Sequence, residues 1–366
     1  MQTTDSWYKI DNVGELDSPA LVVFPARVKH NIQLAIQMVG DVERLRPHVK
    51  THKSPDVARM MIASGISKFK CATIAEAEML AQCNAKDVLL AYQPIGPKLQ
   101  RFISLIKNYP DTQFSCLVDN ISTATEQSIA FEKNGLIVSV YIDLNVGMNR
   151  SGISPDQAVD LFNQAGSLKG IRIVGLHAYD GHIRDANFEV RKERCDSAFK
   201  KVEEILDGRQ GPIIIAGGSP TFSIHCKREK IECSPGTFIY WDKNYTDQCP
   251  EQKFLPAAVL VTRVISLPAP GRICVDLGHK SVAAENEITK RVHFLNATEL
   301  VPVSQSEEHL VLQTSESHSY KPGDILYGLP FHVCPTVALY ERVYTIENGL
   351  VSKEWKNIAR DRKLLV

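Results

Sequence analysis

The chain has 366 residues, enough for two domains or for one large barrel with an appendage. Lys and Arg together number 42, as do Asp and Glu, so the formal net charge is zero. This balance gives no electrostatic case for nucleic acid or for an anionic membrane surface. We therefore expect a small-molecule substrate.

Targeting signals and cysteine usage both point to the cytoplasm. Residues 1–20 contain no basic patch followed by an apolar run, so no signal peptide is expected. The apolar runs have the length of strands and not of membrane spans. Nine cysteines without a repeated spacing indicate reduced thiols and a cytoplasmic protein.

Short β-branched runs alternate with amphipathic helical patterns between about residues 27 and 236. Strands are expected at 44–50, 68–72, 88–92, 114–118, 137–144, 171–179, 212–216 and 230–233. Helices are expected at 74–83, 121–134, 155–165 and 188–206, with Thr73, Asn120 and Ser154 as capping candidates. Eight strand–helix units predict an α/β fold with a (β/α)8 TIM-type barrel, and a doubly wound sheet is the alternative.

The pattern changes after residue 250, where long helical stretches end. Strand-like runs follow at 259–265, 273–276, 292–294, 309–312 and 339–346, separated by turn sequences. We expect a barrel over residues 18–249 and a second, β-rich domain over residues 250–366, completed by about residues 1–17.

A lysine stands at the expected C-terminal end of the first barrel strand, where active-site residues of such barrels lie. Lys50 ends an otherwise apolar run and is flanked by Lys53 and by protonatable His48 and His52. Neighbouring cations favour the neutral amine that a Schiff-base lysine needs. Lys50 and His52 are the catalytic candidates of this segment, although an ordinary surface lysine is the alternative.

Glycine turns follow the seventh and eighth expected strands, where barrels often bind phosphate through backbone N–H groups. The turns are Gly217-Gly218-Ser219 and Gly236-Thr237. Glycine allows a close backbone approach, and the Ser and Thr hydroxyls add donors. Together the two turns suggest a phosphate-bearing cofactor, whereas each alone is an ordinary turn.

A histidine and a cysteine stand two residues apart near the C-terminus. On an extended segment, His332 and Cys334 would point to the same side. Imidazole with thiolate suits Zn²⁺. A buried cysteine near a satisfied histidine is the alternative for this spacing.

Several segments resemble the fold-type III enzymes that use pyridoxal phosphate (PLP), the alanine-racemase-like barrels. They are RPHVKTHK, DLNVGMNRSGI, GLHAYDGH, AGGSPTF and SPGTF. With the late FHVCPTV, the first of them resembles the branch of D-threonine aldolases and D-serine dehydratases. The resemblance covers almost the whole chain, and its motifs occur in the family's order.

The resemblance implies roles for particular residues. Lys50 would carry PLP as a Schiff base, Tyr179 would pack against the pyridine ring, and Arg150 would lie near the polar edge of the cofactor. The phosphate would be held by Gly218, Ser219, Gly236 and Thr237. His332 and Cys334 would bind a divalent metal, Zn²⁺ first and Mn²⁺ as the alternative.

The resemblance also implies an activity. We expect a metal-assisted lyase that dehydrates β-hydroxy D-amino acids such as D-serine or D-threonine to a 2-oxo acid and ammonia. A D-threonine aldolase is the alternative, followed by an amino-acid racemase and by a PLP-binding protein without catalysis. Related enzymes are usually dimers, so a homodimer is expected, with neither nucleic acid nor membrane as a partner.

Overall fold

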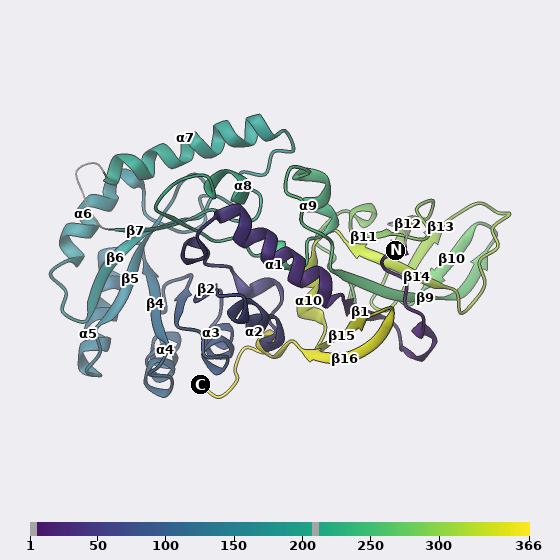
Figure 1. Ribbon diagram of the computed structural model, residues 1–366, viewed down its shortest axis with the longest axis horizontal. Coiled ribbons are helices and arrows are strands. Elements are labelled where there is room, and N and C mark those ends of the chain that lie inside the picture. Colours follow the sequence, from purple (N-terminus) through teal and green to yellow (C-terminus); the bar gives the residue numbers. More distant parts are fainter. Residues whose placement is uncertain (1–5, 207–211) are drawn as a thin grey trace.

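The computed structural model describes residues 6–206 and 212–366. Figure 1 shows an elongated molecule with a helix-covered barrel at one end and a strand-rich domain at the other. Helix α1 (Pro25–Val39) crosses between the two ends, and the C-terminal segment returns to the barrel near α3 and α4. No helix in the described part of the chain has both the length and the apolar character needed to cross a bilayer.

Seven parallel strands form one sheet whose neighbours follow chain order. They are β2 (Lys68–Cys71), β3 (Asp87–Leu90), β4 (Gln113–Val118), β5 (Val138–Leu144), β6 (Ile171–Ala178), β7 (Ile213–Ala216) and β8 (Ile231–Cys233). The accompanying helices are α2 (Pro55–Ala63), α3 (Ile74–Gln82), α4 (Pro97–Asn108), α5 (Ile121–Lys133), α6 (Pro155–Ala165), α7 (Phe188–Leu206), α8 (Phe222–His225) and α9 (Lys243–Gln248). This alternation confirms the predicted α/β, barrel-type fold.

The strand expected over residues 44–50 is wrong. Residues 45–48 lie between β8 and β2, but only through isolated bridges from Leu45 to Cys233 and from His48 to Lys70. Pro47 has no N–H to donate to a ladder. The His48 side chain then accepts the N–H of Lys50 and starts a 3-10 turn over Val49–Thr51. An irregular segment therefore takes the eighth position of the barrel.

Two of the three predicted capping residues cap their helices. Thr73 accepts the backbone N–H of Glu76 at the start of α3, and Asn120 accepts that of Thr123 at the start of α5. Ser154 makes no such bond at the start of α6. A proline at the first position of α6 presets the helical φ angle there.

The second sheet has nine strands and is mostly antiparallel. Its strands are β1 (Ala20–Val23), β9 (Ala258–Ala269), β10 (Arg272–Val275), β11 (Val292–Phe294), β12 (Val301–Gln305), β13 (Leu310–Gln313), β14 (Ile325–Pro330), β15 (Arg342–Glu347) and β16 (Leu350–Lys356). Strand β1 falls within residues 18–249, yet it pairs with β9 and β15 of this sheet. The strand expected over 339–346 begins only at Arg342, because helix α10 (Val333–Leu339) precedes it.

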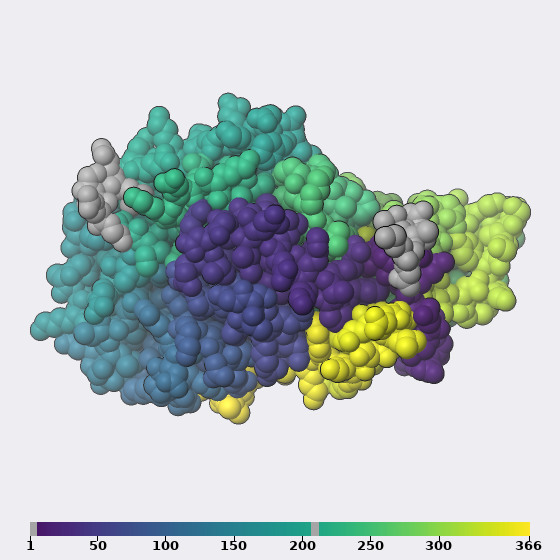
Figure 2. Space-filling view, in the orientation of Figure 1, coloured from purple at the N-terminus to yellow at the C-terminus, as the bar shows by residue number. Residues whose placement is uncertain are grey.

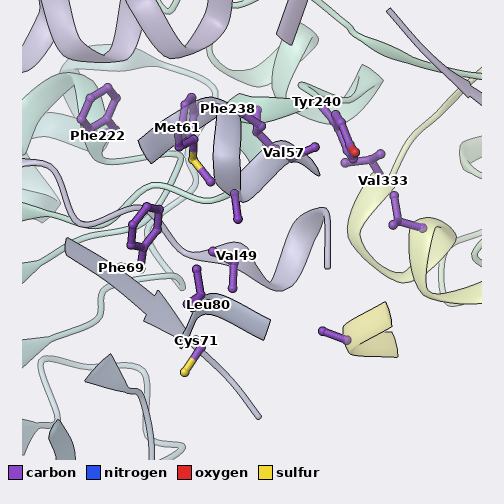
Figure 3. Packing of buried hydrophobic residues seen from close by; sticks show 14 of the residues in the cluster. Val49, Val57, Met61, Phe69, Cys71, Leu80, Phe222, Phe238, Tyr240 and Val333 are labelled. Carbon is purple, nitrogen blue, oxygen red and sulfur yellow. The ribbon is translucent and has the colours of Figure 1, made fainter. Parts of the chain in front are cut away.

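The barrel and the β-rich domain share packed surface. In Figure 2, N-terminal residues fill the space between the barrel and the β-rich end. Figure 3 shows Val49, Phe238, Tyr240 and Val333 in one neighbourhood, and all four belong to one hydrophobic cluster. Val49 precedes Lys50, Phe238 follows Thr237, and Val333 lies between His332 and Cys334. One core therefore holds three of the predicted site segments in place.

Candidate active site

Lys50 lies in the 3-10 turn that follows the irregular barrel segment, and it is partly buried. Its Nζ is 5.8 Å from the centroid of the Tyr179 ring. The hydrogen bond from its backbone N–H to His48 Nδ1, 3.2 Å long, fixes the turn. Lys50 and Tyr179, which the sequence predicts to share a site, therefore face one another.

Two further cations lie against the Tyr179 ring. The Arg150 guanidinium carbon is 5.2 Å from the ring centroid, and Lys70 Nζ is 5.4 Å from it. Within residues 6–206 and 212–366, Arg150 forms no salt bridge. An anionic ligand on this ring would thus meet three positive groups.

The phenol of Tyr179 occupies space that two glycines leave open. A Cβ atom on Gly218 would lie 3.0 Å from Tyr179 Cε2, and one on Gly181 would collide with the phenol oxygen. The absence of side chains at both positions therefore allows the Tyr179 ring to lie against the Gly217–Ser219 loop, the expected phosphate-binding loop after β7.

Backbone N–H groups converge on one hydroxyl between the seventh and eighth loops. The N–H groups of Gly236 and Thr237 donate to Ser219 Oγ at 3.2 and 2.9 Å. A Cβ atom on Gly236 would lie only 3.1 Å from the His48 carbonyl oxygen, so this backbone is closely approached. The four predicted phosphate-binding residues are brought together, with N–H donors of the kind that bind phosphate.

The histidines beside Lys50 are not the cations that the sequence suggested. Burial, together with nearby Lys50 and Lys70, lowers the pKa of His48 well below its ordinary value. Burial also lowers the pKa of His52 to about 3. His52 Nδ1 accepts the N–H of Ser54, so its contacts are those of a structural residue. Lys53 is occupied by an ion pair with Glu76.

A second lysine, which the sequence analysis did not single out, extends a chain of polar groups inside the barrel. Lys70 Nζ lies 3.4 Å from His177 Nε2, and His177 Nδ1 lies 2.7 Å from Asp143 Oδ1. Ser151 donates to the other oxygen of Asp143 at 3.0 Å. The only available sequence signal was a charged residue inside a strand expected to be buried.

His332 and Cys334 do not lie on an extended segment. His332 is the N-cap of α10, and Cys334 lies in the first turn of that helix. The two side chains still lie close enough for each to shift the pKa of the other. Asp242 fixes the start of the helix, because its Oδ2 accepts the N–H of Val333 at 3.1 Å.

The thiol of Cys334 reaches the barrel site. Its Sγ is 3.1 Å from Thr51 Oγ1 and 3.6 Å from Thr237 Oγ1. Burial opposes ionisation of this thiol, but the nearby His332 lowers its pKa below the ordinary value. Burial likewise opposes the His332 charge, yet Cys334 and Glu285 raise the pKa of His332 to about 9. The Cys334 thiol thus lies beside Thr237 and beside Thr51, the residue that follows Lys50, whereas the half-exposed His332 ring is paired with Glu285.

A second group of potential metal ligands lies next to the loop that follows β7. Asp180, Cys195 and His225 are buried, and their ligand atoms lie within 4.8 Å of one another. His225 Nε2 is 2.9 Å from Asp180 Oδ2, and Thr221 donates to Asp180 Oδ1 at 2.8 Å. These hydrogen bonds tie the end of β6 to the loop after β7, which explains the cluster without an ion.

The fold and site together define an alanine-racemase-like barrel joined to a β-rich domain. The family model described as "Alanine racemase, N-terminal domain" matches residues 24–244, and that described as "Putative serine dehydratase domain" matches residues 257–346. The chain therefore belongs to the alanine racemase N-terminal domain family.

Individual relatives agree with this assignment. A D-threonine aldolase of Arthrobacter sp. is 27% identical over 366 aligned residues, which cover 96% of this chain and 94% of the relative. A D-serine dehydratase of Dictyostelium discoideum is 22% identical and covers 92% of this chain and 95% of the relative. The crystal structure of D-threonine aldolase from Filomicrobium marinum matches with a TM-score of 0.86 and 26% identity, covering 94% of this chain and 96% of that one.

Proposed function

We propose that the protein is a PLP- and metal-dependent lyase acting on β-hydroxy D-amino acids. The observation that carries the proposal is the contact between Cys334 and Thr51, the neighbour of Lys50. It joins the expected metal-binding pair to the expected cofactor lysine across the barrel and the β-rich domain. The named relatives, an aldolase and a dehydratase, act on substrates of this class.

The residues present fit PLP. Ser219 and the N–H groups of Gly236 and Thr237 suit a phosphate, and Gly218 leaves the room that a Cβ would fill. Lys50 supplies the amine for attachment, and Tyr179 supplies a flat face. When bound there, PLP would act as an electron sink for charge that develops at Cα of an amino acid.

The His332–Cys334 pair fits a divalent metal. Imidazole and thiolate are the ligands that Zn²⁺ prefers, and two protein ligands leave positions for water and substrate. A cation held there would stabilise negative charge on the β-oxygen of the substrate.

The residues of the chain have separate tasks in this proposal. Lys50, once its amine is free, takes the proton from Cα of the substrate. Arg150 and Tyr179 orient the cofactor ring, one by charge and the other by packing. The donors around Ser219 anchor the phosphate and so fix the distance from the ring to Lys50.

Dehydration is the branch that we infer, because the pair ends in cysteine, as in the dehydratases that the segments resemble. Retro-aldol cleavage is the second candidate, favoured by the 27% identity to a D-threonine aldolase along the whole chain. D-Threonine separates them. 2-Oxobutanoate with ammonia supports dehydration, whereas glycine with acetaldehyde would establish the aldolase.

Metal analysis tests the location of the cation. Purified protein is expected to hold about one metal ion per chain, and H332A and C334A are expected to lose it. C195S is the matched control, because it removes a thiol from the other cluster of potential ligands. Loss of metal in C195S, with retention in H332A and C334A, would contradict the assignment.

We also infer a cytoplasmic homodimer without nucleic-acid or membrane partners. All nine cysteines are free thiols, which suits a reducing compartment. Exposed apolar residues of the β-rich domain, namely Ile265, Leu267, Val301 and Val303, offer surface for a second copy. Sedimentation equilibrium tests the dimer, and a single species of monomer mass at micromolar concentration would contradict it.

A further inference from the structure

Lys70 is a buried cation that has no counterion among the described residues. It lies on β2 and is 2% exposed, and in the described part of the chain its side chain hydrogen-bonds with His177 alone. Within the described ranges, no carboxylate lies within ion-pair distance of its ammonium. Buried lysines are almost always paired, so an unpaired one needs a reason.

Lys68, on the same strand, shows what a paired lysine looks like. It lies two positions earlier and so on the same face of β2, toward the other end of the barrel. Its Nζ is 2.8 Å from Glu232 and 3.6 Å from Glu43. Lys70 lies on the same strand and the same face as Lys68, but its ammonium lies over the Tyr179 ring and not beside a carboxylate.

The groups around Lys70 come from every side of the site. Lys50, His48 and Arg46 face it from the irregular segment, Asp143 from β5, His177 from β6, and Tyr179 and Asp180 from the end of β6. His177 holds its proton toward Asp143, so Nε2 accepts from Lys70. Asp143 is already bonded to His177 and Ser151. The positive charge beside the Tyr179 ring is therefore not neutralised by Asp143, whose oxygens are used by other partners.

We propose that Lys70 is a cofactor-binding residue, which supplies positive charge to the anionic ring of the cofactor against Tyr179. The proposal rests on the proposed function, because the ligand is its cofactor. Lys70 lies at the ring of Tyr179, whereas the phosphate-type donors lie around Ser219. The ring, and not the phosphate, is thus the part of the cofactor that Lys70 serves.

The charge of Lys70 depends on pH in the neutral range. Burial and the nearby Lys50 lower the pKa of Lys70 to about 7. An anionic ligand favours the ammonium form, so ligand binding and protonation of Lys70 support each other. The contribution of Lys70 to affinity is therefore greatest below pH 7 and declines as the pH rises above it.

The test uses 4′-deoxypyridoxine 5′-phosphate, which has the ring and phosphate of the cofactor but no aldehyde for Lys50. Its Kd is measured by calorimetry on cofactor-free wild type, K70M, K70R and K68M. K70M is expected to bind about 10-fold or more weakly at pH 6.5, which is the scale of one charge-assisted contact. The ratio of K70M to wild-type Kd is expected to approach one by pH 9, and K70R to restore most of the affinity at both pH values.

Control measurements keep the outcomes distinct. K68M is expected to bind within about 2-fold of wild type. K70M removes a buried unpaired charge, so its Tm is expected to be no lower than that of wild type. Equal Kd values for wild type and K70M, or a ratio that does not change with pH, would overturn the role of Lys70. Failure of wild type itself to bind the analogue would instead overturn the proposed function. Equal weakening of inorganic phosphate binding in K70M would refute the assignment to the ring.

Discussion

Arg46 is expected to hold the irregular barrel segment that carries Lys50. Its side chain is 0% exposed, and it binds Asp87 through two hydrogen bonds of 2.6 and 2.9 Å. Its Nε lies 2.6 Å from Glu232, on β8. These bonds connect the segment to β3 and β8, and they add to the few backbone bonds that the segment makes with its neighbours.

The loss of stability in R46M depends on the interactions that Asp87 and Glu232 retain without the guanidinium. Breaking a buried ion pair costs about 3 to 5 kcal/mol when a charge is left without a partner. Glu232 keeps Lys68 at 2.8 Å, and the Asp87 side chain is 25% exposed. Both effects reduce the penalty, so we expect the free energy of unfolding to fall by about 3 kcal/mol, the lower end of that range.

Urea unfolding at neutral pH measures this change. R342M is the matched control, because Arg342 also binds two carboxylates but lies partly in solvent, so its loss is expected to cost far less than that of Arg46. Adding D87N to R46M is expected to recover part of the loss, because it removes the unpaired charge. Equal effects of R46M and R342M would refute the reasoning.

Three further predictions concern the site. G218A would place a Cβ 3.0 Å from Tyr179 Cε2, so PLP affinity is expected to fall about 5-fold with little change in Tm; unchanged affinity would contradict the packing. Chelation is expected to abolish lyase activity and added Zn²⁺ to restore it, whereas activity that survives chelation would favour a racemase. Burial lowers the pKa of His52 to about 3, so between pH 6.5 and about pH 3 the unfolded chain binds a proton at His52 that the folded chain does not bind. Stability is then lost as the pH falls, by roughly 1.4 kcal/mol per unit, and H52Q is expected to flatten this slope in acid unfolding curves; an unchanged slope would exclude the effect.

Much of the barrel could be predicted because its signals are local. Helix α6 has the predicted ends and α7 the predicted start, since apolar periodicity and flanking turn residues mark them. The irregularity of the first strand has a local signal in Pro47, whereas the distant ionic partners of Arg46, Asp87 and Glu232, could not be predicted from the sequence. Helix α10 did carry a signal, a proline in its first turn at Pro335, which marks a helix start more than an extended segment.

The site was predictable in parts and not as a whole. Glycine turns and the His332–Cys334 spacing can be read from the sequence, whereas the Lys70–His177–Asp143 chain joins three strands and has no spacing of its own. Likewise, the low pKa of His48 and of His52 comes from burial that neighbouring residues do not reveal.

Borohydride reduction of the PLP-loaded protein tests the central claim most directly. Reduction fixes the cofactor to the amine that carries it, and peptide mapping then identifies that lysine. We expect one pyridoxyl group per chain, on Lys50, and none in a K50A variant that still folds. A pyridoxyl group on Lys70 or on any other lysine of the wild-type protein would contradict the account.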